Sequence, residues 1–213
     1  MEYPNSRLPS SPSCENTMEI LCSNIPVRVH RNAELADRGA LRAQKDWQQH
    51  FGALPPRYGG TMGPELNFVA TIFPEILPDR IEHMGYIVEI VFLVDDMIDT
   101  AESPMAAAAP YMVDLWQAYS VVKAGGDMDA TLCTPAAKKI VDFAQAMVLV
   151  DPDRATGAFQ WLVKWAKLTQ SGPVSSKECQ NFNEYLEYRR LNVSSQCVPR
   201  FSLGLLSHLL FTS

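Results

Sequence analysis

The sequence predicts an all-α protein, and three features of the chain indicate this. Long segments repeat their apolar residues with the 3.6-residue period of a helix. Clusters of Gly and Pro lie between these segments. No segment alternates apolar and polar residues as a half-buried strand would. Tight connections such as Leu77-Pro78 and Asp151-Pro152 further predict a compact antiparallel helical bundle.

The helices are expected in the following order. The first covers 33–51, which is rich in helix-forming residues and has Leu35, Leu41 and Trp47 as apolar points. The Gly- and Pro-rich segment 52–60 ends it. Further helical patterns, each preceded by Pro, Asp or Ser, cover 65–73, 79–100, 104–123, 135–150, 153–170 and 177–192.

The composition is that of one ordered globular unit. Its 213 residues are 47% hydrophobic and 20% charged, and the net charge of -6 comes with no Lys/Arg run, so no nucleic-acid-binding face is expected. Five scattered cysteines suit a reducing compartment, so we expect a cytoplasmic protein. The N-terminus lacks a signal-peptide pattern, and no apolar stretch reaches the roughly 18 residues of a membrane span.

The helix expected at 79–100 carries acids on its apolar face. One stripe, expected to be buried, contains Ile81, Met84, Val88, Val91 and Phe92. Asp95 and Asp99 continue this stripe, and Asp96 lies at its edge. Buried carboxylates need a cation or a water-filled cavity, and a cluster of oxygen ligands selects magnesium. The alternative is that these acids lie in solvent beyond the packed part of the helix.

A second polar residue interrupts the apolar face of the helix expected at 177–192. That face is formed by Phe182, Tyr185, Leu186 and Val193. Arg189 lies within it, whereas Arg190 turns aside. An inward arginine needs an anion, which is either a structural carboxylate or a diphosphate shared with bound magnesium.

Several motifs resemble one enzyme family. The sequence FLVDDMID at 92–99 looks like the DDxxD motif of class I terpene synthases. Segments 25–31, 38–47 and 63–68 resemble the N-terminal cyclase domain of fungal bifunctional terpene synthases. Segment 185–193 is similar to the part that carries the family's diphosphate-sensing arginine. The likeness covers 25–193 and leaves an N-terminal extension, 1–24, and a divergent tail, 194–213.

The resemblance implies a class I terpene cyclase domain that uses Mg²⁺ to ionise and cyclise a linear prenyl diphosphate. The implied substrate is geranylgeranyl, geranylfarnesyl or farnesyl diphosphate. The sequence leaves open whether the chain forms a homo-oligomer. The implied metal-binding residues are Asp95, Asp96 and Asp99, with Asp96 flanking the other two. Arg189 would grip the diphosphate beside Asn192, and the ring of Phe92 would stabilise a passing carbocation. Phe68, Phe73 and Trp116 have suitable rings as well.

The chain also departs from the family. Asn192 and Ser194 stand where the family usually has Asp and Gly. The second metal-binding motif, an Asn/Ser/Glu triad, has no counterpart before Ser213. We therefore expect a bundle that is incomplete at its C-terminal end and a short form that does not cyclise prenyl diphosphates at an ordinary rate. The alternative function is that of a catalytically incompetent remnant or a non-catalytic binding protein.

Overall fold

The computed structural model describes residues 3–10, 27–55, 58, 60–100, 135–152, 157 and 179–192. These residues are mostly helical, which confirms the all-α class. The helix expected at 104–123 lies outside them, as does all of the one expected at 153–170 except the helical Gly157. The chain forms two compact units, Met1–Leu93 with Leu206–Ser213, and Val94–Leu205.

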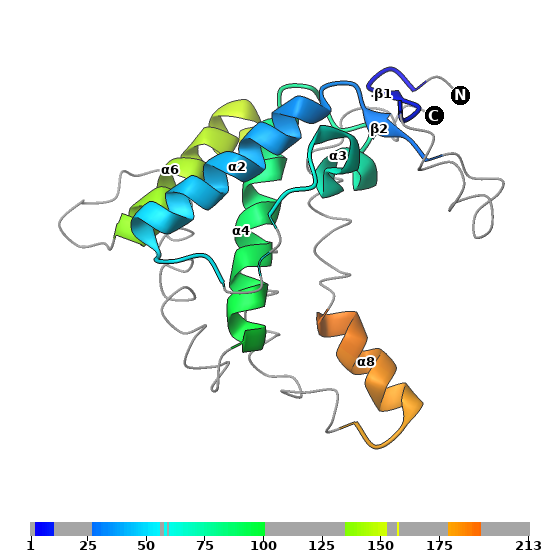
Figure 1. Cartoon of the computed structure of the whole chain (residues 1–213), viewed down its shortest axis with the longest axis vertical. Coiled ribbons are helices and arrows are strands. Elements are labelled where there is room, and N and C mark those ends of the chain that lie inside the picture. The colour runs from blue at the N-terminus through cyan, green and yellow to red at the C-terminus, as the bar shows by residue number, and fades with distance from the viewer. Residues whose placement is uncertain are drawn as a thin grey trace. The chain divides into compact units, whose positions relative to one another are not determined.

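The first unit contains most of the described elements. In chain order they are β1 (Ser6–Arg7), β2 (Val29–His30), α2 (Ala33–His50), the 3-10 helix η1 (Pro64–Leu66), α3 (Phe68–Ile72) and the first part of α4 (Ile81–Thr100) (Figure 1). The helix expected at 65–73 is therefore a 3-10 turn followed by a short α-helix. Asn67 separates the two because its backbone is extended, with φ -62° and ψ 127°.

A small β-ribbon joins the N-terminal segment to the start of the bundle. Strands β1 and β2 are antiparallel, and Ser6 pairs with His30 and Arg7 with Val29. Ser6, His30 and Val29 are all buried. The sequence did not predict this ribbon, because two-residue strands are too short to show an alternating pattern.

Helix α2 packs through its small residues. The buried positions are Ala33, Ala36, Gly39, Ala40, Ala43 and Trp47. Of the apolar residues in this helix, Trp47 is buried, whereas Leu41 is 53% exposed. The small side chains let α4 approach closely: a Cβ atom on Gly39 would lie 2.2 Å from the backbone oxygen of Glu82. A Cβ atom on Gly85 would lie 2.3 Å from that of Ala36.

Polar contacts continue the α2–α4 interface on either side of this crossing. Glu82 forms ion pairs with Arg38 and with Arg42 at its outer edge. Farther along, the side-chain amide of Gln44 donates a hydrogen bond of 2.6 Å to Glu89, which is only 7% exposed. A buried carboxylate is tolerated only with such a partner, so the hydrogen bond between Gln44 and Glu89 helps to fix the rotation of α4 about its own axis.

The second unit contains the end of α4, from Val94, together with α6 (Pro135–Val150) and α8 (Phe182–Asn192). Helix α6 has the predicted bounds, buries Val141 and Met147, and carries a Lys138–Asp142 ion pair of 2.8 Å. Among the described helices, none is long and apolar enough to cross a membrane.

Helix α8 begins five residues later than the sequence predicts. Asn181 caps it, because its Oδ1 accepts a hydrogen bond of 3.0 Å from the backbone N–H of Glu184. The carboxylate of Glu184 in turn accepts a hydrogen bond of 2.8 Å from the N–H of Gln180. The Asn181 cap, supported by this return contact of Glu184, marks the start of the helix at Phe182.

Candidate metal and diphosphate site

The face of α4 that leads to the acids is only partly buried. Ile81 and Met84 are buried as predicted. The expected stripe is wrong farther along, where Val88 and Val91 are half-buried and Phe92 is 37% exposed, whereas Leu93 is fully buried. The inward face in the second half of α4 thus turns toward Leu93, and Phe92 presents ring surface that a ligand can reach.

The acids follow Phe92 on the same helix. Asp95 is exposed and Asp96 is half-buried, so Asp95 does not continue a buried face as the sequence suggested. Asp99 belongs to α4 one turn after Asp95, and its side chain lies outside the described residues. Two neighbouring carboxylates at the end of one helix supply the oxygen ligands that magnesium prefers.

No group of three or more His, Cys, Asp and Glu side chains that could hold a metal gathers within the described residues. Magnesium usually keeps several water ligands and is bound by one or two carboxylates together with substrate phosphates.

An aromatic pair lies before the acids. The rings of Phe68 and Phe92 meet edge to face, with centroids 5.1 Å apart and an interplanar angle of 74°. Phe68 is 45% exposed, so neither ring is buried core. Phe73, by contrast, is only 5% exposed and packs in the core, and Trp116 lies outside the described residues.

The position of Phe68 is set by the residues before it, in the segment 63–68. Gly63 has φ 82°, a conformation that side chains other than glycine rarely adopt. The carboxamide of Asn67 then caps α3 by accepting hydrogen bonds from the backbone N–H groups of Val69 and Ala70, at 3.0 and 3.2 Å. The dipeptide Gly63-Pro64 followed by Asn67 is the sequence signal for this turn and cap.

The predicted diphosphate-binding residues lie on α8. Arg189 is exposed, and the side chains of Arg190 and Asn192 lie outside the described residues. The prediction of a buried apolar face around Arg189 is wrong for the described residues, since Phe182 is 69%, Tyr185 38% and Leu186 47% exposed. Neighbouring rings on α8 stack on one another instead, as Phe182 and Tyr185 do at 6.3 Å.

The structure therefore brings together Phe92 with Phe68, and Asp95 with Asp96, whereas Arg189 stands on a separate helix. No protein-family model matches the chain.

Individual homologues do match. The chain is 33% identical to phomopsene synthase of Phomopsis amygdali over 92% of its own length and 26% of that protein. It is 33% identical to ophiobolin F synthase oblA of Aspergillus clavatus over 82% of its length and 23% of the relative. The third, bifunctional sesterterpene synthase astC of Talaromyces wortmannii, is 30% identical over 96% of this chain and 27% of the relative.

The chain is therefore class I terpene synthase-like, and fungal terpene synthases are its homologues. It spans about a quarter of the length of these relatives. The similarity extends over most of this chain and agrees with its helical fold.

Proposed function

We propose that the chain supplies the binding of magnesium and of a linear prenyl diphosphate to a class I terpene cyclase, the type of enzyme that ionises this substrate and cyclises the hydrocarbon. The homology to named synthases supports the cyclase role and does not favour a non-catalytic binding protein. The substrate is geranylgeranyl, geranylfarnesyl or farnesyl diphosphate. We also propose a cytoplasmic location, because the scattered cysteines suit a reducing compartment.

The acids of α4 would hold the metal. Asp95 and Asp99, one turn apart, are the proposed ligands, and Asp96 flanks them. When bound there, Mg²⁺ neutralises charge that develops on the departing diphosphate and so lowers the barrier to C–O cleavage. Asp95 is exposed at the end of its helix, and can therefore bind metal without first losing a buried packing contact.

The exposed Arg189 is proposed to bind the diphosphate from α8, beside Asn192 at the end of that helix. A guanidinium group offers a planar fork of donors that matches two diphosphate oxygens at once. Its positive charge is permanent, so this contact persists as the negative charge on the leaving group grows. The electrostatic attraction between Arg189 and the diphosphate would thus become stronger during ionisation.

The aromatic pair would face the hydrocarbon. A carbocation is attracted to the face of an aromatic ring, and the attraction is worth about 0.5–2 kcal/mol, depending on how dry the site is. The edge-to-face contact between Phe68 and Phe92 gives the two rings different orientations. Two orientations would let the rings contact different carbons of one prenyl chain.

The single observation that carries this proposal is the homology to terpene synthases over most of the chain. Its test is calorimetric binding of a prenyl thiolodiphosphate, which cannot readily ionise, with and without Mg²⁺. We expect magnesium-dependent binding that Asp95→Asn weakens about tenfold or more.

Asp142→Asn is the matched control, because Asp142 is an exposed aspartate that pairs with Lys138 on α6. It removes the same charge and should leave the binding unchanged. Equal losses in both variants would indicate a general effect of charge and would contradict the assignment of the site to α4.

A further inference from the structure

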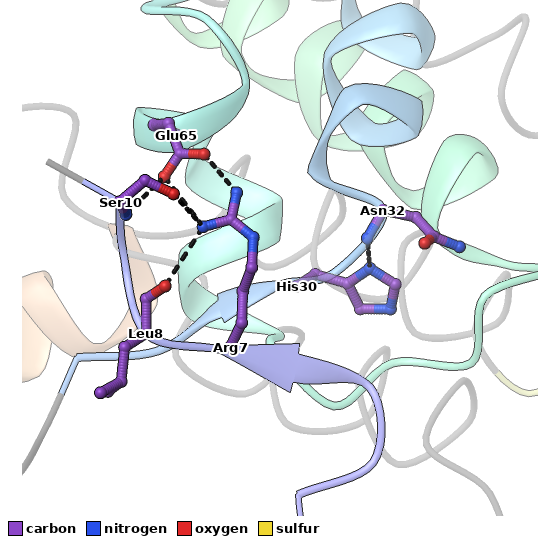
Figure 2. Close-up of polar contacts among 6 residues, drawn as sticks. All are labelled: Arg7, Leu8, Ser10, His30, Asn32 and Glu65. Carbon is purple, nitrogen blue, oxygen red and sulfur yellow. Dashed lines mark hydrogen bonds and ion pairs between the residues drawn. The ribbon is translucent and has the colours of Figure 1, made fainter.

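The N-terminal segment Tyr3–Ser10, here called the N-terminal strap, contacts the chain on both sides of α3. Before α3, both terminal nitrogens of Arg7 donate hydrogen bonds to the carboxylate of Glu65, and the backbone N–H of Ser10 donates another at 3.2 Å (Figure 2). After α3, the backbone N–H of Asn5 donates to the carboxylate of Glu75 at 3.2 Å. The strap therefore holds both flanks of the short helix that begins with Phe68.

The N-terminal strap is held in place by β2 and by the neighbouring Arg28. It pairs with β2, and the guanidinium of Arg28 donates to the Oγ and the backbone oxygen of Ser6, at 2.6 and 3.2 Å. His30 of β2 is fully buried, with Nε2 2.9 Å from the backbone oxygen of Ile76. Its Nδ1 accepts a hydrogen bond of 2.9 Å from the N–H of Asn32 (Figure 2). Through His30, these contacts connect β2, the strand with which the strap pairs, to Ile76 in the segment after α3.

The Arg7–Glu65 contact has the geometry of a specific clamp. The guanidinium reaches both carboxylate oxygens, and the same group donates to the backbone oxygen of Leu8 at 3.2 Å and to the Oγ of Ser10 at 3.1 Å. The hydrogen bond to Glu65 raises the pKa of Arg7, and the same contact lowers the pKa of the Glu65 carboxyl. A two-oxygen contact fixes direction as well as distance, which a single point charge does not.

We propose that Arg7 is a positioning residue for the ring pair Phe68 and Phe92, here called the hydrocarbon-binding wall. By binding both carboxylate oxygens of Glu65, Arg7 fixes η1 and thereby holds the ring of Phe68 against that of Phe92. Glu65 is the middle residue of η1, and Phe68 follows it by three residues. The inference deepens the proposed function and rests on it, because it assigns the two rings to the hydrocarbon part of a prenyl diphosphate.

The test uses the full chain and two independent measurements on Arg7→Met and Arg7→Lys. The first is hydrogen exchange of the backbone amides of 68–73. We expect exchange about fivefold faster in Arg7→Met, the effect of losing one partly exposed ion pair. Arg7→Lys keeps the charge without the fork and should give an intermediate value.

The second measurement compares the binding of a prenyl thiolodiphosphate with that of inorganic diphosphate, both with Mg²⁺. A misplaced wall should weaken binding of the prenyl compound roughly fivefold or more and leave inorganic diphosphate unaffected. General destabilisation would instead weaken both. The matched control is Arg38→Met, which breaks a largely exposed Arg–Glu ion pair between α2 and α4 while Arg42 still pairs with the same carboxylate of Glu82. It should change neither measurement.

The outcomes separate the two claims. Unchanged exchange in 68–73, or equal losses for both ligands in Arg7→Met, would overturn the positioning role. Faster exchange with a selective loss of the prenyl compound would support it. If the wild-type chain binds the prenyl compound no better than inorganic diphosphate, the proposed function is contradicted, and so is the role of Arg7 in positioning the hydrocarbon-binding wall. The hydrogen-exchange data would then still show whether Arg7 stabilises α3.

Discussion

The close crossing of α2 and α4 makes a sharp prediction for one substitution, Gly85→Ala. The added Cβ would lie 2.3 Å from the backbone oxygen of Ala36 and 3.0 Å from its carbonyl carbon. Ordinary contact begins at 3.4 Å. The atoms it meets belong to backbone, so a side-chain rotation cannot relieve the clash. The two helices must separate by about 1 Å, which loosens the packing of both.

The magnitude follows from two opposing terms. Overpacking of this kind costs about 1–3 kcal/mol. Replacing a helical glycine by alanine gains about 1 kcal/mol from backbone entropy. We therefore expect Gly85→Ala to lower the free energy of unfolding by up to about 2 kcal/mol, and Gly39→Ala, whose Cβ would meet the backbone of Glu82 at 2.2 Å, to do the same.

Urea denaturation followed by circular dichroism measures this change. Gly157 is the control, because it is helical and nothing lies within 4 Å of the Cβ it would gain. Gly157→Ala should therefore stabilise the protein by about 0.5–1 kcal/mol, so the two alanine substitutions should differ in sign. If Gly85→Ala is as stabilising as Gly157→Ala, the close approach of α2 and α4 is refuted.

Three further predictions concern the surroundings of the site. Asn67→Ala removes the cap that accepts hydrogen bonds from Val69 and Ala70, so it should destabilise the protein by about 1–2 kcal/mol in urea denaturation, whereas Asn67→Asp, which keeps an accepting oxygen, should cost less. Burial lowers the pKa of His30 below its ordinary 6.5, so its contribution to stability is fully present above pH 6.5 and is lost as the pH falls further. A His30→Gln variant whose stability falls as steeply as that of the wild type between pH 7 and 5 would contradict this. Phe92→Ala should weaken binding of a prenyl thiolodiphosphate, measured by calorimetry, about fivefold and leave binding of inorganic diphosphate unchanged. An equal loss of affinity for both ligands would contradict the proposal that Phe68 and Phe92 contact the hydrocarbon.

The sequence predicts a helix well where its apolar period and its end signals agree. Helix α6 is such a case, since Pro135 begins it and Asp151-Pro152 follows its end. Helix α8 starts later than predicted because the Asn181 cap, supported by Glu184, outweighs the helix-forming residues before it.

Packing partners are harder to predict, because periodicity shows that a face is distinct but does not show what it meets. In α2 the large Leu41 is exposed, and the core side is built from alanines, Gly39 and Trp47. The sequence contains the signal, small residues spaced three or four apart, but their use depends on the neighbouring Gly85 of α4. A single-helix pattern cannot contain that information.

The candidate site shows the same limit. The aspartates and Phe92 could be located from the sequence, because they form one run at the end of a long helix. The contact of Phe92 with Phe68, and the clamp of Arg7 on Glu65 that precedes it, join residues far apart in the sequence. Such contacts follow from the tertiary fold, and no local spacing predicts them.

The measurement that tests the central claim most directly is the electron paramagnetic resonance of Mn²⁺, used in place of Mg²⁺, with inorganic diphosphate and the full chain. The account predicts protein-bound Mn²⁺ that requires diphosphate, because magnesium-type ions bind to one or two carboxylates together with phosphate oxygens. Asp95→Asn should return most of this signal to that of free Mn²⁺-diphosphate, and Asp142→Asn should not. A bound-metal signal of equal strength in the wild type and in Asp95→Asn would contradict the claim that the acids of α4 hold the metal.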